Sequence, residues 1–218
     1  MDELVKRHPD ALRALENATQ EEVERVIRAM GQGNPKDVED ILRSYMYKAQ
    51  KKYRKGGEGA SLEPPANVGA RVEESVENLA EARARGFPFG FKDKPQYDQF
   101  LAKLESEIAA RKIAGKPKVQ GSAMHSKTPG DIDVEILVEP AEFERLANQF
   151  LGHAPPGKLK RELEVGIKKQ KIPSFHFFPD VNPPIGEAVK SLTGTAGPME
   201  VQATLIVKGS DFDLGPTL

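Results

Sequence analysis

Two acidic side chains at strand spacing are the first candidates for chemistry in this sequence. Residues 119–138 read "VQGSAMHSKTPGDIDVEILV", and Asp131 and Asp133 stand at the start of its second apolar run. Side chains alternate along a strand, so both carboxylates project from one face, about 6.5 to 7 Å apart at the Cα atoms, while Ile132 enters the core. Mg²⁺ takes oxygen ligands and leaves its other positions to water and substrate phosphates. The pattern is therefore typical of two-metal phosphoryl or nucleotidyl transfer, with Mg²⁺ or Mn²⁺ as the cation.

A Gly-Ser pair in the same stretch is the candidate for binding nucleotide phosphates. Gly121 lets the backbone approach a ligand closely, and free N–H groups beside the Ser122 hydroxyl at the start of a helix or turn favour an anion. Lys127, in the loop before the aspartates, is a candidate phosphate partner. Glu200, at the head of the apolar run "MEVQATLIV", is the candidate third carboxylate of the cation site.

Each of these residues also has a purely structural interpretation. Polar residues occupy the wet face of any half-buried strand, so Asp131, Asp133 and Glu135 could be solvent-facing acids without a ligand. Acids are common at strand starts, which applies to Glu200. The loop lysine could be an ordinary surface residue, and a loop histidine such as His125 is usually exposed unless it touches substrate.

Three further motifs admit two interpretations each. Asp211 and Asp213 repeat the acidic pattern in "GSDFDLGP", but with no loop before them they favour a turn or a C-terminal anchor. The aromatic stretch "FPFGF" could stack on a base or pack beneath the sheet. A basic stretch followed by "FHFF" is either a solvated helix face with a core strand or, beside an NTP site, a contact for RNA. Its basic residues are Lys158, Lys160, Arg161, Lys168, Lys169 and Lys171.

The elements that must position these residues alternate between helix and strand. A capping box at Thr19 and Glu22 begins one helix, and a second helix follows Pro35. A longer core helix carries the apolar stripe of Tyr97, Phe100 and Leu104 and is predicted to end at Gly115. Strands are predicted at 118–120, 131–138, 173–178 and 199–207, with helices around 143–150, 159–167 and 186–192. The fold class is α/β (α+β), with a small mixed sheet flanked by helices and an N-terminal helical region.

The domain organisation follows from composition. A Gly- and Pro-rich stretch predicts a linker at 57–70 between an N-terminal helical hairpin region, 1–56, and a catalytic domain, 71–218. The absence of cysteine excludes disulfides, Cys-ligated zinc and a thiol nucleophile. A formal net charge of −1 excludes a general polycation, and the sequence contains neither a signal peptide nor an apolar run long enough for a membrane span. We therefore expect a soluble protein.

The quoted segment resembles the Gly-Ser, then Asp-x-Asp signature of the polymerase-β-like nucleotidyltransferase superfamily. The resemblance implies that Gly121 and Ser122 hold phosphate, that Asp131 and Asp133 bind Mg²⁺, and that a third acid, here Glu200, assists. "GFPFGFKDKPQYDQF" and "KGSDFDLGP" on either side make residues 86–218 similar to nucleotidyltransferase-type toxin modules of bacterial polymorphic toxins. The interval between the Gly-Ser pair and the aspartates is short for the superfamily.

This resemblance implies transfer of a nucleoside monophosphate from an NTP to a macromolecule. The basic stretch, if it lies next to the site, favours RNA or tRNA over protein as the acceptor. The resemblance also implies interbacterial competition, action in the cytoplasm of a target cell, and a cognate immunity protein as partner. Two other functions remain open from the residues. Paired acids also serve metal-dependent nucleases, although Glu135 is not followed by the lysine that is common there. The same fold could also be a non-catalytic nucleotide- or protein-binding module.

Overall fold

The chain divides into two compact units, Met1–Glu81 and Ala82–Leu218. The computed structural model describes residues 19–32, 36–38, 41–42, 67–173, 184–210, 212–213 and 218. Most of the predicted linker lies outside these residues, so the domain boundaries drawn from composition stay a prediction.

The first unit contains α3, Gln20–Gln32, and most of α5, Val68–Arg85. The predicted capping box is present at the start of α3: Thr19 N donates to Glu22 Oε2 at 3.0 Å, and Glu22 N donates to Thr19 Oγ1 at 3.3 Å. The helices pack closely at Gly69, where a Cβ atom would lie 2.6 Å from the carbonyl oxygen of Glu22. The predicted second helix is described only at residues 36–38 and 41–42, which are helical.

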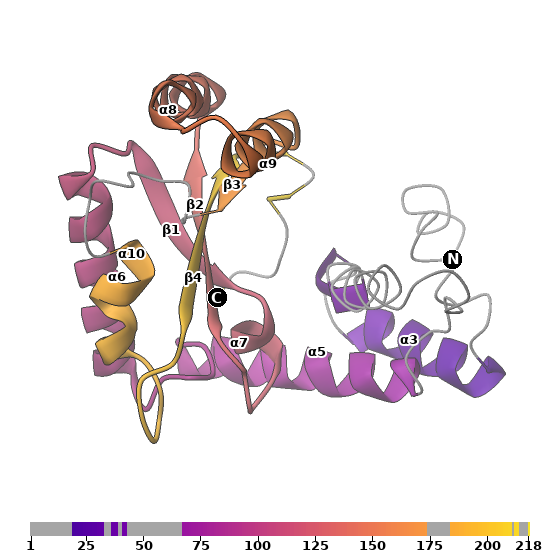
Figure 1. Ribbon diagram of the computed structural model, residues 1–218. Helices are drawn as coiled ribbons and strands as arrows, with labels where there is room; N and C mark the ends of the chain where they lie inside the picture. The colour runs from indigo at the N-terminus through magenta and orange to yellow at the C-terminus, as the bar shows by residue number, and fades with distance from the viewer. Residues whose placement is uncertain are drawn as a thin grey trace. The chain divides into compact units, whose positions relative to one another are not determined.

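A four-stranded mixed sheet forms the centre of the second unit, with strand order β1-β2-β4-β3 (Figure 1). The strands are β1 Gly115–Gln120, β2 Ile132–Val138, β3 Lys171–Pro173 and β4 Val201–Val207. The neighbours β2 and β4 are parallel, while β1 and β3 pair antiparallel at the two edges. This architecture confirms the predicted α+β class. Residues 174–178 of the predicted "PSFHFF" strand lie outside the described part of the chain.

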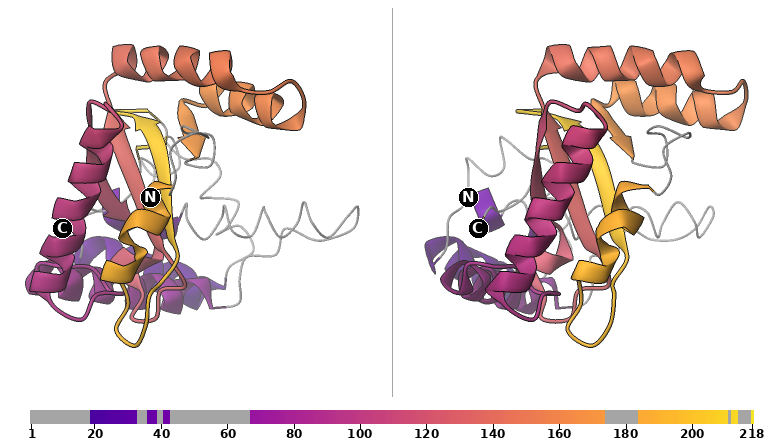
Figure 2. Two further views of the ribbon diagram at one scale, coloured as in Figure 1. Left: turned by 60° about the vertical axis from the view of Figure 1, so that its left-hand side comes forward. Right: turned by 90° about the vertical axis from the view of Figure 1, so that its left-hand side faces the viewer.

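The two faces of the sheet differ in chemistry because side chains alternate along each strand. One face is apolar and buried, and β4 contributes Val201, Ala203, Leu205 and Val207 to it as predicted. The helices α6, Lys94–Ala110, and α10, Ile185–Val189, cover this face (Figures 1 and 2). A 3₁₀ turn, Lys190–Leu192, follows α10. The other face is polar, and it carries the acidic residues of β2.

Three further helices of the second unit, α7, α8 and α9, lie at the two ends of the sheet. The helix α7, Ser122–His125, contacts β1 and β2 at the lower end in Figure 1. The helices α8, Pro140–His153, and α9, Lys158–Lys168, lie at the upper end, where α8 contacts β4 and α9 contacts β3 (Figures 1 and 2). The chain therefore crosses the full length of β2 between α7 and α8.

The long core helix ends earlier than the sequence predicts. Asp93 caps α6 by accepting a hydrogen bond from Gln96 N at 2.9 Å, and the predicted aromatic stripe is buried. The helix ends at Ala110 because Lys112 has a positive φ of 56°. Gly115, predicted as the helix end, is instead the first residue of β1, where a Cβ atom would lie 2.8 Å from the side chains of Ile136 and Val138.

The aromatic turn before α6 belongs to the core. Phe89 and Phe91 are buried, and the ring of Phe91 lies 5.1 Å from that of Tyr97 and 5.0 Å from that of Phe100, measured between centroids. The guanidinium of Arg85 lies 4.1 Å from the ring centroid of Phe87. The interpretation that this stretch packs beneath the sheet is therefore correct for Phe89 and Phe91, because their buried rings leave no face for a base to stack on.

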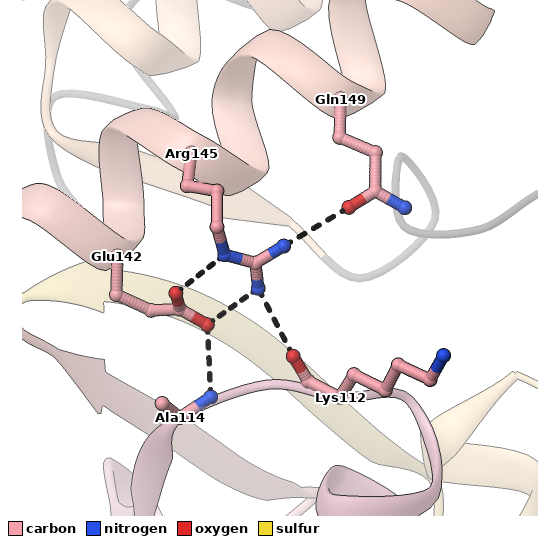
Figure 3. Close-up of polar contacts among 5 residues, drawn as sticks. All are labelled: Lys112, Ala114, Glu142, Arg145 and Gln149. Atoms are coloured by element: carbon pink, nitrogen blue, oxygen red, sulfur yellow. Dashed lines mark hydrogen bonds and ion pairs between the residues drawn. The ribbon is translucent and has the colours of Figure 1, made fainter.

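A polar clamp joins α8 to the turn before β1 (Figure 3). Arg145 donates to both carboxylate oxygens of Glu142 at 2.7 Å and to the carbonyl oxygen of Lys112 at 3.0 Å. Glu142 in turn accepts from Ala114 N at 2.9 Å, and Arg145 reaches Gln149 Oε1 at 3.4 Å. The clamp holds α8 against the upper end of the sheet.

Candidate functional site

The Gly-Ser pair and the aspartates meet at the lower end of the sheet. The antiparallel register pairs Gln120 with Asp133, so the chain leaves β1 next to the point where β2 begins. Gly121 precedes α7 with φ 70° and ψ −150°, and a Cβ atom on it would lie 2.2 Å from Asp133 Oδ2. The glycine backbone is therefore in direct contact with the carboxylate, and Ser122 begins α7, as the sequence indicates for a pair at a helix start.

Glu200 and Asp131 lie together on the same side of the sheet. Ile132 N donates to the carbonyl oxygen of Glu200 at 2.9 Å, which begins the parallel pairing of β2 with β4. The side-chain amide of Gln202 donates to Asp131 Oδ2 at 3.0 Å and to Glu200 Oε1 at 3.2 Å. Asp133 lies opposite Gln202 in the register of these two strands. The candidate carboxylates Asp131, Asp133 and Glu200 therefore all lie near the starts of β2 and β4.

Glu135 is buried on the polar face, which excludes the interpretation that it is a solvent-facing acid. Its exposed fraction is 1%, and Lys118 Nζ, from the opposite position of β1, lies 3.8 Å from its Oε2 atom. Lys118 Nζ also lies 3.5 Å from Asp213 Oδ1. Burial raises the pKa of Glu135 to about 8, although Lys118 opposes this shift.

The C-terminal segment is anchored to this polar face. Asp213 accepts a hydrogen bond from Gly209 N at 2.9 Å in addition to its ion pair with Lys118. Lys171 Nζ lies 4.6 Å from the ring centroid of Phe212. These contacts agree with the interpretation of Asp213 as part of a turn and a C-terminal anchor, whereas Asp211 lies outside the described residues.

Two residues between β1 and β2 differ in how far they are buried. His125 lies in α7 and is only 6% exposed, so the expectation of an exposed loop histidine is wrong. It is buried because α7 packs on the ends of β1 and β2. Lys127, the predicted phosphate partner, is exposed in the loop that leads to Asp131.

The basic stretch lies at the wrong end of the sheet for contact with this site. Most of its cations are on α9, which contacts β3, and β3 pairs with residues 204–206 near the end of β4. Glu200 and Asp131 lie at the start of β4 and β2 instead. The expectation that basic residues flank the acidic cluster is therefore wrong, and with it the argument that favoured RNA as acceptor.

The lower end of the sheet carries oxygen donors of the kind that a hard divalent cation takes. The carboxylates of Asp131, Asp133 and Glu200 supply the oxygen ligands that Mg²⁺ prefers, and the glycine backbone leaves room at the Asp133 carboxylate that any side chain would fill. In the described ranges, no group of three or more acidic or histidine side chains is assembled at ligand distances. A cation held there by fewer than three of these side chains would need water and substrate phosphates as its other ligands.

Two residues of the polar face, Gln202 and Lys118, were not predicted from the sequence. Gln202 follows Glu200 by two residues in a predicted strand, so strand parity alone was a signal that the two share a face. Lys118 was not recognisable as the partner of Glu135, because their proximity depends on the register between β1 and β2.

Comparisons with models of protein families, with curated proteins and with solved structures find no match for this chain. None of the described helices has both the length and the apolar character needed to span a bilayer.

Proposed function

We propose that this chain is a divalent-cation-dependent nucleotidyltransferase that moves a nucleoside monophosphate from an NTP to an RNA or protein acceptor. The observation that carries the proposal is the contact between Gly121 and Asp133, in a backbone conformation that only glycine adopts readily. It joins a candidate phosphate-binding backbone to a candidate cation ligand. Asp131 and Glu200 hydrogen-bond to Gln202, which lies opposite Asp133 in the register of β2 and β4.

The reaction assigns separate roles to these residues. Gly121 and Ser122 bind and orient the triphosphate, while Asp131, Asp133 and Glu200 hold the cation. The acceptor hydroxyl oxygen forms a bond to the α-phosphorus, the bond from this phosphorus to the bridging oxygen of the β-phosphate breaks, and pyrophosphate leaves with the electron pair. The hydroxyl proton passes to solvent.

Catalysis in this scheme consists of positioning and charge neutralisation. The bound cation supplies positive charge that stabilises the phosphate oxygens during transfer. No general-base histidine is assigned, and the burial of His125 is consistent with a packing role.

The direct test is transfer of label from each common NTP, labelled with ³²P at the α-phosphate, into the RNA and protein of a bacterial lysate. We expect label in one macromolecular fraction with the wild type and Mg²⁺, and loss of that label in Asp133→Ala and in Asp131→Ala/Asp133→Ala. Asp98→Ala is a matched control, because this aspartate is exposed on α6 and pairs with Lys94.

The outcomes separate the candidate functions. Absence of label from every NTP, or full transfer by the double variant, would overturn the proposal. Cleavage of RNA without any NTP would identify a metal-dependent nuclease, and binding of Mg²⁺-NTP without transfer would identify a non-catalytic module.

The proposed role as an antibacterial toxin with an immunity protein rests on the sequence resemblance alone. It predicts that expression of the wild type in a bacterial cytoplasm arrests growth and that the double aspartate variant does not. Equal growth with both proteins would count against a toxin role without bearing on transfer measured in vitro.

A further inference from the structure

A short turn near the C-terminal end of the chain crosses the polar face of the sheet. This C-terminal strap consists of Gly209, Ser210, Phe212 and Asp213. Asp213 Oδ1 lies 3.5 Å from Nζ of Lys118 on β1, and the ring centroid of Phe212 lies 4.6 Å from Nζ of Lys171 on β3. These two strands are the edges of the sheet, with β2 and β4 between them. The strap is therefore attached to both edges.

The carboxylate of Asp213 is the link between the strap and the sheet. Its Oδ2 atom accepts a hydrogen bond from Gly209 N at 2.9 Å, which closes the turn, while Oδ1 faces Lys118. Ser210 N donates to the carbonyl oxygen of Val207 at 3.1 Å, and Asp213 N donates to that of Ser210 at 3.0 Å. The turn is therefore held together by its own hydrogen bonds and can move as one piece.

A buried carboxyl group lies beside this link. Glu135 is opposite Lys118 in the register of β1 and β2, and the Nζ atom of Lys118 lies 3.8 Å from its Oε2 atom. This oxygen is buried and has no hydrogen-bond partner among the residues that the structure describes. Such burial costs free energy, whereas water would satisfy the oxygen. Closure of the strap is therefore favoured by Asp213 and opposed by Glu135, and both acids face the same lysine.

We propose that the C-terminal strap opens and closes over the polar face, with Lys118 as its latch. In the closed form Lys118 pairs with Asp213. In the open form Asp213 enters water, Lys118 pairs with Glu135 alone, and water reaches the buried oxygen. Glu135 lies two positions along β2 from Asp133 on the same face, so opening extends the accessible surface from the candidate site toward the centre of the sheet. The inference does not depend on the proposed function, because opening is measured without NTP or cation.

The test is amide hydrogen exchange of the full ¹⁵N-labelled chain, followed by nuclear magnetic resonance. The amides of Gly209 and Ser210 report opening of the strap, and those in the centre of β2 report global unfolding. In the wild type we expect the strap amides to exchange at least about tenfold faster than the β2 amides, relative to their intrinsic rates. This measurement does not depend on whether a variant folds.

The first variant removes the charge that holds the strap. We expect Asp213→Asn to speed exchange at Gly209 and Ser210 by at least about threefold, because a neutral amide loses the attraction of the lysine. The β2 amides should stay protected. The substituted position is not adjacent to either reporting amide, so their intrinsic exchange rates do not change.

The second variant distinguishes a latch from a contact that only adds stability. Glu135→Gln removes the acid that competes with Asp213 for Lys118, so exchange at the strap amides should slow by at least about threefold. Asp98→Asn is the matched control, because this aspartate is exposed on α6 and pairs with Lys94. It should leave exchange at the strap unchanged.

Trypsin gives an independent measurement, because cleavage after Lys208 requires the strap to leave the sheet. Mass spectrometry should detect release of residues 209–218 sooner from Asp213→Asn and later from Glu135→Gln than from the wild type. Unchanged exchange at the strap in folded Asp213→Asn, or unchanged or faster exchange in Glu135→Gln, would overturn the inference. Equal protection of the strap and β2 amides in the wild type would also overturn it, since the strap would then open only when the whole unit unfolds.

Discussion

At the scale of single residues, Gly121 links backbone conformation to the candidate chemistry. Its φ of 70° and ψ of −150° fall in a region that is essentially restricted to glycine. The same residue lies against the carboxylate of Asp133. A side chain at this position would therefore be strained by the backbone and would also displace a proposed cation ligand.

We predict that Gly121→Ala lowers the free energy of unfolding by about 1 to 3 kcal/mol, the usual cost of a strained backbone conformation. Chemical denaturation followed by circular dichroism measures this difference. Gly130→Ala is the matched control, because no atom lies within 4 Å of a Cβ placed there. Its stability should stay within about 1 kcal/mol of the wild type. Equal stability of the two variants would contradict the prediction.

Glu135 gives the second prediction at this scale, which concerns pH. Burial raises its pKa in the folded protein to about 8 from an ordinary value of 4.5, so the folded state favours the protonated carboxyl. The contribution of this group to stability is complete below pH 4.5 and is lost as the pH rises to about 8. The charged groups that influence it are Lys118, which opposes the shift, and Asp213 and Asp133, which add to it.

Glu135→Gln should remove this pH dependence, because the amide is neutral throughout. We expect the variant to gain stability relative to the wild type between pH 5 and 9, by a few kcal/mol at the alkaline end. Thermal unfolding across this pH range measures the gain. A constant difference between the two proteins at all pH values would show that Glu135 does not titrate as predicted.

At the scale of elements, the polar clamp joins α8 to the turn before β1 (Figure 3). Its hydrogen bonds join residues separated by about thirty positions in the chain. The bond to Arg145 lowers the pKa of Glu142, and the backbone N–H of Ala114 contributes in the same direction. The charged form of Glu142 is therefore the form that the folded state stabilises.

Arg145→Ala should destabilise the protein by about 1 kcal/mol, since the pair is bidentate but the arginine is half exposed. Arg145→Lys should not restore this loss, because an ammonium cannot reproduce the planar two-bond contact. The difference from the wild type should shrink as the pH falls below 4.5, because Glu142 then takes up a proton more readily in the unfolded chain than in the folded protein. Denaturation of the three proteins at two pH values tests this, and full rescue by lysine would contradict it.

At the scale of the whole molecule, the second unit contains a complete sheet and the helices that bury its apolar face. A unit with its own core is expected to fold independently. We predict that a chain of residues 82–218 unfolds in one cooperative transition. Calorimetry checks this, and a broad transition without a heat-absorption peak would refute it.

Local sequence patterns were sufficient to predict several secondary-structure elements and part of the site. The capping box of α3, the buried stripe of α6 and the alternation of β4 are set by neighbouring residues, so they were readable from spacing alone. The same holds for Asp133 on the polar face of β2, whereas Asp131 precedes the first residue of this strand. The end of α6 was not readable, because the positive φ of Lys112 has no distinctive residue type.

Which of these residues come into contact depends on the tertiary structure. The contact of Gly121 with Asp133 depends on the register of β1 against β2, and the cluster of Asp131, Glu200 and Gln202 depends on parallel pairing between strands that are distant in the chain. The burial of Glu135 and the separation of α9 from the acidic cluster depend on the same strand order. Strand pairing is non-local, and a single strand's pattern shows which face each side chain occupies but not which strand lies beside it.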